Sequence, residues 1–190
     1  MIKFAITGNI ASGKTSVEEI LSEHNYPVLD TDKVCHKLLF ELDEIKNEFK
    51  NFDVFDANGE ISREKLGHLV FDNEKLKQKL ENILYPVVRI EIEKFFKKNK
   101  NKKAAFAAVP LLFEAKMESL FDKILFIYCD DKIRLKRLME RNNYDKTYAQ
   151  KRLDSQMEQS LKISKSDIII NNNSDKTALR QEVEDFIKEL

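Results

Sequence analysis

The chain has 190 residues, of which 42% are hydrophobic and 35% are charged. This composition fits one compact domain and excludes a disordered acidic tail, a collagen-like fibre and a membrane bundle. The 33 basic and 33 acidic side chains give a formal net charge of +0. No overall field therefore draws the chain to nucleic acid or to anionic lipid, and we expect neither as a partner.

Cysteine usage and the N-terminus predict a cytoplasmic protein. The two cysteines, Cys35 and Cys129, are too few for a disulfide framework or a zinc site. The apolar start of the chain is too short for the hydrophobic region of a signal peptide. The longest apolar run, residues 104–113, has about half the length that a membrane helix needs.

Short apolar runs and amphipathic stretches alternate along most of the chain, which predicts an α/β fold with a parallel sheet of about five strands flanked by helices. The predicted strands are 3–7, 27–29, 104–109, 124–129 and 168–170, and the predicted helices cover 15–22, the stretch around 34–39 and the C-terminal stretch 178–190. The run 104–109 has no polar residue, as expected of a strand that is covered on both faces.

The stretch from about 43 to 101 shows helical patterns without a strong strand, and it is longer than a simple crossover needs. We therefore expect an inserted helical subdomain, in which Pro86 separates two helices or begins the second. The expected organisation is a single domain over 1–190, with a core of 1–42, 102–134 and 164–190, an insert at about 43–101 and a lid at about 135–163.

Residues Gly8–Thr15 read G-N-I-A-S-G-K-T and match the phosphate-loop pattern G-x-x-x-x-G-K-[ST] between a predicted strand and a predicted helix. Gly8 permits a sharp turn, and Gly13 lets the backbone approach phosphates without a Cβ. Lys14 can reach the β- and γ-phosphates, and the Thr15 hydroxyl can ligate Mg²⁺. The pattern predicts nucleotide binding without specifying a reaction.

Two classes of phosphate-loop protein fit poorly. A GTPase needs N-K-x-D, but Asn101–Ala104 has alanine in place of the aspartate. The stretch Asp56–Gly59 matches D-x-x-G, yet it lies in a cluster of turn residues and is interpreted as a hairpin or loop. An ATP-driven motor needs a carboxylate directly after a hydrophobic strand, and none follows the strand at 104–109.

A small-molecule kinase fits better, because it needs a carboxylate near the acceptor and arginines in a mobile lid. Asp30 and Asp32 follow the second predicted strand, although a helix cap would explain them too. Arg134, Arg137 and Arg141 lie on one helical stripe and suit bidentate phosphate binding, although a solvated face would also explain them. A nucleoside or nucleoside-monophosphate kinase and a non-catalytic nucleotide switch remain open alternatives.

In its order of motifs, the chain resembles the dephospho-CoA kinase family over nearly its whole length. The similar stretches are Gly8–Thr15 (family G-G-I-G-S-G-K-[ST]), Asp30–Asp32 (D-A-D), Gly59–Leu66 followed by Val70-Phe71 (G-x-[IL]-x-R-x-x-L, then VF or IF), Val109–Glu114 (V-P-L-L-x-E), Arg152–Gln156 (R-[IL]-x-x-Q) and Ser166–Asn172 (A-D-x-[VI]-I-x-N). The departures are Asn9 and Ala11 in place of glycines, Tyr85 in place of the usual histidine, and Asn173 where glycine is common.

The resemblance implies transfer of the ATP γ-phosphoryl group to the ribose 3′-hydroxyl of dephospho-CoA, with Mg²⁺ and an Arg-rich lid. We expect a monomer or weak homo-oligomer. Lys14 and Asp32 would be the catalytic residues, Asp32 as the base, and Thr15 the metal ligand. The implied ATP-binding residues are Gly8, Ala11, Ser12, Gly13, Lys14, Thr15, Ser16, Arg137, Arg141, Asn171 and Asn172, of which Asn171 and Asn172 would lie near the adenine. The implied dephospho-CoA-binding residues are Asp32, Arg63, Phe71, Tyr85, Leu111 and Leu112.

Overall fold

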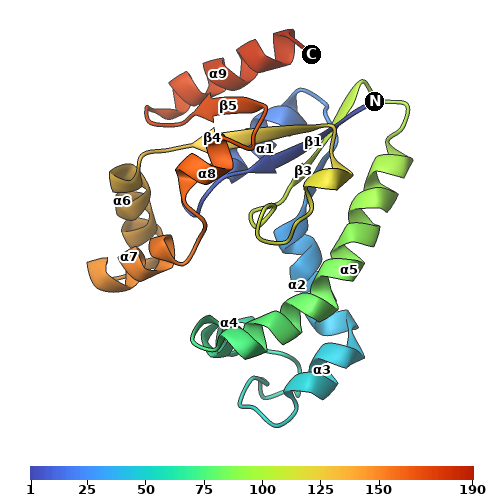
Figure 1. The fold of residues 1–190 in the computed structure, drawn as a ribbon, viewed down its shortest axis with the longest axis vertical. Helices are drawn as coiled ribbons and strands as arrows, with labels where there is room; N and C mark the ends of the chain where they lie inside the picture. Colours follow the sequence, from blue (N-terminus) through green and yellow to red (C-terminus); the bar gives the residue numbers. More distant parts are fainter. The chain divides into compact units, whose positions relative to one another are not determined.

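The computed structural model describes all residues from 1 to 190, and they form two compact units (Figure 1). The first unit comprises Met1–Asp30 and Phe95–Leu190, and the second comprises Thr31–Lys94. The strands are β1 (Ile2–Thr7), β2 (Val28–Asp30), β3 (Ala104–Ala108), β4 (Lys123–Tyr128) and β5 (Ile168–Asn171). The helices are α1 (Lys14–Glu23), α2 (Thr31–Glu41), α3 (Asp43–Phe49), α4 (Arg63–Phe71), α5 (Glu74–Lys98), the 3₁₀ turn η1 (Glu118–Leu120), α6 (Asp131–Asn142), α7 (Lys146–Asp154), α8 (Gln159–Ile163) and α9 (Lys176–Lys188).

The first unit is built on a five-stranded sheet in the order β2-β3-β1-β4-β5, with every neighbouring pair parallel. This confirms the predicted sheet. The register pairs Asp30 with Ala108 and Ala108 with Ile6, so β2, β3 and β1 end at one edge. Since ligands of such sheets bind at the carboxyl ends of the strands, where the strand order reverses, this edge is the expected binding crevice.

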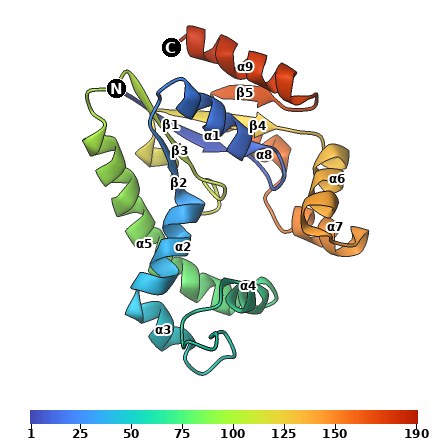
Figure 2. The ribbon, with the colours of Figure 1, turned by 180° about the vertical axis from the view of Figure 1, so that it is seen from behind.

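Helices cover both faces of the sheet: α1 lies on one face and α8 on the other, as the two opposite views show (Figures 1 and 2). Helix α9 packs against α1 and β5. The Phe4 ring stacks on Phe106 with centroids 4.9 Å apart, and Phe186 meets Phe4 edge-on at 5.6 Å. All five residues of β3 are buried, as the unbroken apolar sequence predicted. None of the helices in the chain is both long and apolar enough to cross a lipid bilayer.

The second unit has its own small core, in which Ile45, Phe49 and Leu66 are at most 2% exposed. A bridge between Phe55 and Ile61 closes a short hairpin. The D-x-x-G stretch forms the turn of this hairpin, which confirms its interpretation as a hairpin or loop.

The prediction that Pro86 interrupts or begins a helix is wrong. Helix α5 runs unbroken from Glu74 to Lys98 with Pro86 inside it. An interior proline removes one backbone hydrogen bond and costs about 3 kcal/mol. The helix nevertheless continues, because Leu84, Val88 and Ile92 are all buried along one stripe, and each such burial contributes about 1.5–3 kcal/mol. Pro86 leaves the carbonyl of Asn82 without its helical partner, and both residues are exposed, so water can reach that carbonyl.

Candidate active site

The phosphate loop connects β1 to α1 at the carboxyl edge of the sheet, and two glycines are required by its close contacts. A Cβ on Gly13 would lie 2.1 Å from the side-chain nitrogen of Asn172, and Gly13 has a left-handed φ of 94°. A Cβ on Gly8 would lie 2.7 Å from the carbonyl oxygen of Ile127. Ala11 also has a left-handed backbone, with φ 62°. An alanine there costs about 1–2 kcal/mol relative to glycine, so the loop is held in this shape by its surroundings.

Within the loop, the backbone and Lys14 hold the turn closed. Ser12 N donates to the carbonyl of Asn9 at 3.1 Å. Lys14 Nζ donates to the carbonyls of Gly8 at 2.7 Å and Asn9 at 3.3 Å, so its ammonium group lies across the loop. No side chain caps the first turn of α1. A helix N-terminus of this kind, with a partial positive charge, suits a bound anion.

The segment after α7 contacts the first residues of the loop. The side-chain amide of Asn9 donates to the carbonyl of Met157 at 2.9 Å, and Ile10 N donates to Gln156 Oε1 at 2.7 Å. Asn9 is only 2% exposed. At position 9, where the resemblance expects glycine, the asparagine side chain thus makes a hydrogen bond that glycine could not make.

The three arginines of the predicted stripe lie in three different surroundings. Arg134 is only 3% exposed, contacts Asp131 Oδ1 at 2.7 Å and donates to the carbonyl of Ile10 at 3.3 Å. Arg137 is half-buried and its Nη1 lies 3.9 Å from the Cβ position built on Gly13. Arg141 is exposed and donates to Asn142 Oδ1 at 2.9 Å. Arg134 thus contacts the phosphate loop; it belongs to the predicted arginine stripe but not to the ATP-binding residues that the resemblance implies.

The end of β4 carries two groups whose protonated forms are favoured. Burial raises the pKa of the Cys129 thiol, although the guanidinium groups of Arg137 and Arg134 oppose the shift. Tyr128 donates a hydrogen bond to Asp130 Oδ1, and this bond raises the pKa of Tyr128. Cys129 therefore stays a neutral acceptor for Arg137 Nη1, which approaches its sulfur to 3.4 Å.

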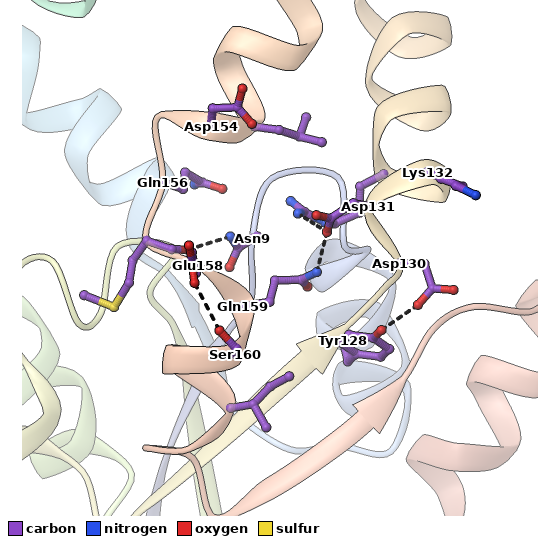
Figure 3. Close-up of a pocket in the computed structure, with 14 residues that line it drawn as sticks. Asn9, Tyr128, Asp130, Asp131, Lys132, Asp154, Gln156, Glu158, Gln159 and Ser160 are labelled. Carbon is purple, nitrogen blue, oxygen red and sulfur yellow. Dashed lines mark hydrogen bonds and ion pairs between the residues drawn. The ribbon is translucent and has the colours of Figure 1, made fainter.

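A cavity of about 900 Å³ lies beside the loop, between α6 and the segment that leads into α8 (Figure 3). Its charged lining residues are the acidic Asp130, Asp131, Asp154 and Glu158 and the basic Lys132 and Arg134. Four carboxylates against two cations disfavour a polyphosphate by like-charge repulsion. The cavity itself is therefore poorly suited to a polyphosphate.

A buried ion pair anchors α8 to the chain that follows β3. Lys162 is 0% exposed, and its Nζ lies 2.7 Å from Glu114 Oε1. The same carboxylate oxygen accepts from Met157 N at 3.4 Å. Glu114 thereby holds the segment whose Met157 carbonyl contacts the phosphate loop.

Replacing Lys162 with methionine is expected to destabilise the protein by about 3 kcal/mol, since it leaves a carboxylate without its partner in a largely buried place. Urea unfolding at neutral pH would measure the change. The double variant Lys162→Met with Glu114→Leu removes both charges and is expected to recover most of the loss. Equal stability of the single and double variants would contradict a buried ion pair.

The residues predicted for the acceptor site belong to both units. In the second unit, Asp32 is exposed in the first turn of α2, Arg63 is exposed as the first residue of α4, and Phe71 is half-buried as its last residue. Tyr85 is half-buried in α5. In the first unit, two leucines follow β3: Leu111 is half-buried and Leu112 is fully buried.

The two asparagines at the end of β5 differ. Asn171 is exposed, and its side-chain oxygen accepts from Asn173 N at 3.0 Å. Asn172 is 5% exposed, and its side chain donates to the carbonyl of Ser12 at 2.7 Å. The structure therefore brings Asn172 and Arg137 to the phosphate loop, while Arg141 and Asn171 face solvent.

Comparison with known proteins identifies the family of this chain. The chain matches the family described as "Dephospho-CoA kinase" over residues 2–178. A dephospho-CoA kinase of Fusobacterium nucleatum subsp. nucleatum is 37% identical over 184 residues, covering 95% of this chain and 94% of that protein. One of Geobacillus kaustophilus is 34% identical over 193 residues, covering 99% and 96%.

A solved structure, the dephospho-CoA kinase from Campylobacter jejuni, superposes with a TM-score of 0.75 at 34% identity, covering 98% of this chain and 96% of that one. Shikimate kinase from Acinetobacter baumannii, at 13% identity and a TM-score of 0.56, shares the fold alone. The family match spans the sheet, the phosphate loop and the Arg-rich helices. This chain therefore belongs to the dephospho-CoA kinase family.

Proposed function

We propose that this chain transfers the γ-phosphoryl group of ATP to the ribose 3′-hydroxyl of dephospho-CoA, which yields coenzyme A and ADP. The observation that carries the proposal is a phosphate loop with left-handed Ala11 and Gly13 in a chain whose residues 2–178 match that kinase family. In the reaction, the 3′-oxygen forms a bond to the γ-phosphorus, the bond from that phosphorus to the bridging oxygen breaks, and ADP leaves with the electron pair.

For the nucleotide, we propose that the loop and the start of α1 bind the phosphates through Gly8, Ala11, Ser12, Gly13, Lys14, Thr15 and Ser16. The hydrogen bonds from Lys14 Nζ to the loop carbonyls support this, because they hold the ammonium group beside the loop that would bind the negatively charged phosphates. Arg137, close to Gly13, would neutralise charge during transfer, and Arg141 would join it from the end of α6 when the lid closes. Asn171 would lie near the adenine.

For the acceptor, we propose that Asp32 takes the proton of the 3′-hydroxyl. Asp30 ends β2 at the edge where β1 enters the phosphate loop, and Asp32 follows two residues later. Arg63, Phe71, Tyr85, Leu111 and Leu112 would line the dephospho-CoA site. An exposed guanidinium suits the anionic phosphates of this substrate, and the half-buried aromatic rings suit its apolar parts.

We also propose Mg²⁺ as the cofactor. The chain has no group of three or more histidine, cysteine, aspartate and glutamate side chains that could cage a metal, and Mg²⁺ in kinases is held mainly by substrate phosphates and a few protein oxygens. The exposed Thr15 hydroxyl in the first turn of α1 fits that role. When bound, the ion neutralises charge on the β- and γ-phosphates.

We place the enzyme in the cytoplasm as a monomer or weak homo-oligomer. Neither cysteine forms a disulfide, which fits a reducing compartment.

An ADP-release assay across candidate acceptors tests the function. ADP formation is expected to depend on dephospho-CoA and to exceed that with AMP or a nucleoside by at least about 10³-fold in kcat/KM, since acceptor contacts outside the ribose contribute to the transition state. A larger rate with AMP would favour the nucleoside-monophosphate kinase. Tight ATP binding without turnover on any acceptor would favour a nucleotide switch.

A further inference from the structure

We propose that Asn172 is a positioning residue that orients the Ser12–Gly13 peptide of the phosphate loop, and that it serves ATP through this peptide and not by contacting adenine. The proposal rests on the phosphate-binding role of the loop proposed above. It concerns one side chain at the end of β5 and the backbone that it touches.

The first step is the contact itself. Asn172 Nδ2 lies 2.7 Å from the Ser12 carbonyl, and both residues are at most 5% exposed. A carbonyl can only accept, so the amide nitrogen of Asn172 must face it. Buried hydrogen bonds of this kind are costly to break, because the carbonyl would be left without a partner away from water.

The second step is the rigidity of the asparagine. Its backbone N donates to the carbonyl of Tyr128 at 2.8 Å, and the preceding residue, Asn171, pairs with Tyr128 in the sheet. The side chain therefore projects from the end of the sheet with little freedom. Sheet-anchored groups hold a site more accurately than groups on loops do.

The third step is the geometry of the peptide. In a planar trans peptide the carbonyl and the N–H point in opposite directions. Holding the Ser12 carbonyl toward Asn172 therefore directs the Gly13 N–H away from Asn172. The same asparagine lies so close that a Cβ on Gly13 would approach its nitrogen to 2.1 Å, so it also fixes the side on which the loop backbone packs.

Together these contacts hold the Ser12–Gly13 peptide of the loop in one orientation. Because the Gly13 N–H is already oriented, it does not need to reorganise when an anion binds, and such preorganisation strengthens electrostatic binding. Asn172 thus acts on phosphates indirectly, through the backbone N–H of Gly13.

The test uses a probe without a base, inorganic tripolyphosphate, beside ATP and GTP. Asn172→Asp places a carboxylate acceptor opposite the Ser12 carbonyl, and it is expected to weaken ATP and tripolyphosphate by the same factor, about 10- to 100-fold. The preference for ATP over GTP is expected to stay as in the unaltered protein. Isothermal titration calorimetry gives the affinities, and Asn101→Asp, the same change at an exposed turn residue, is the matched control.

The outcomes separate the possibilities. Loss of ATP affinity and of the ATP-over-GTP preference, with tripolyphosphate binding unchanged, would make Asn172 an adenine contact and overturn the inference. Unchanged affinity for all three ligands would also overturn it. If the aspartate variant fails to fold, Asn172→Ser carries the test: its hydroxyl can still donate, and it is expected to lose less affinity than Asn172→Ala. Failure of the unaltered protein to bind tripolyphosphate would instead contradict the proposed function of the loop.

Discussion

A fall in kcat of about 10²–10⁴-fold is expected when Asp32 is replaced by asparagine, the range that a positioned general base contributes. Asparagine keeps the size of the side chain but cannot accept the proton of the 3′-hydroxyl as it attacks phosphorus. The affinity for ATP is expected to change little, because the proposed role of Asp32 concerns the acceptor. Rapid-quench measurement of a single turnover would isolate this chemical step.

The competing explanation is that Asp32 merely stabilises the first turn of α2, where an acidic side chain interacts favourably with the helix dipole. That role is worth about 0.3–1 kcal/mol of stability and no catalysis. Asp43 offers a matched control, since it is an exposed aspartate in the first turn of α3. Asp43→Asn is expected to leave kcat unchanged. Equal rates for the two variants would reduce Asp32 to a helix-terminal charge.

The second large effect is expected at Lys14, whose replacement by alanine should lower kcat about 10²–10³-fold and weaken ATP binding as well. Its ammonium group lies within 2.7 Å of the Gly8 carbonyl and 3.3 Å of the Asn9 carbonyl. The side chain therefore lies across the loop. Steady-state kinetics with varied ATP, together with titration of ATP, would measure both effects.

Those contacts raise the possibility of a purely structural role, in which Lys14 only holds the loop closed. Lys14→Arg separates phosphate binding from a structural role, because arginine keeps the positive charge but replaces the compact ammonium group with a larger, planar guanidinium. If Lys14 binds phosphate, Lys14→Arg should recover part of the ATP affinity that Lys14→Ala loses. The control variant Lys100→Ala, at an exposed turn, should behave as the unaltered protein. Full ATP affinity and full rate in Lys14→Ala would contradict the assignment.

The site is supported by contacts that join distant parts of the first unit. Asn9 and Ile10 are tied to the segment after α7, and that segment is tied in turn to Glu114. The buried Lys162–Glu114 pair therefore helps to hold the segment that contacts the phosphate loop.

Local pattern was sufficient for the strands, for the phosphate loop and for the family. Side chains on a covered strand must be apolar, as in residues 104–108, and a loop that cradles phosphates needs Gly8, Gly13 and Lys14 at fixed spacing. These requirements act between residues that are close in the chain. They can therefore be predicted before any tertiary contact is known.

Tertiary structure decided where equivalent-looking side chains point. Arg134 and Arg141 share one stripe, yet one is buried against Ile10 and the other faces solvent. Asn172 reaches Ser12 across 160 residues, and no spacing rule links positions so far apart. Pro86 stays helical because a continuous apolar stripe is buried around it. Burial and long-range partners exist only once the chain has folded, and this is why the sequence by itself identifies the phosphate loop but not the side chains that hold it in place.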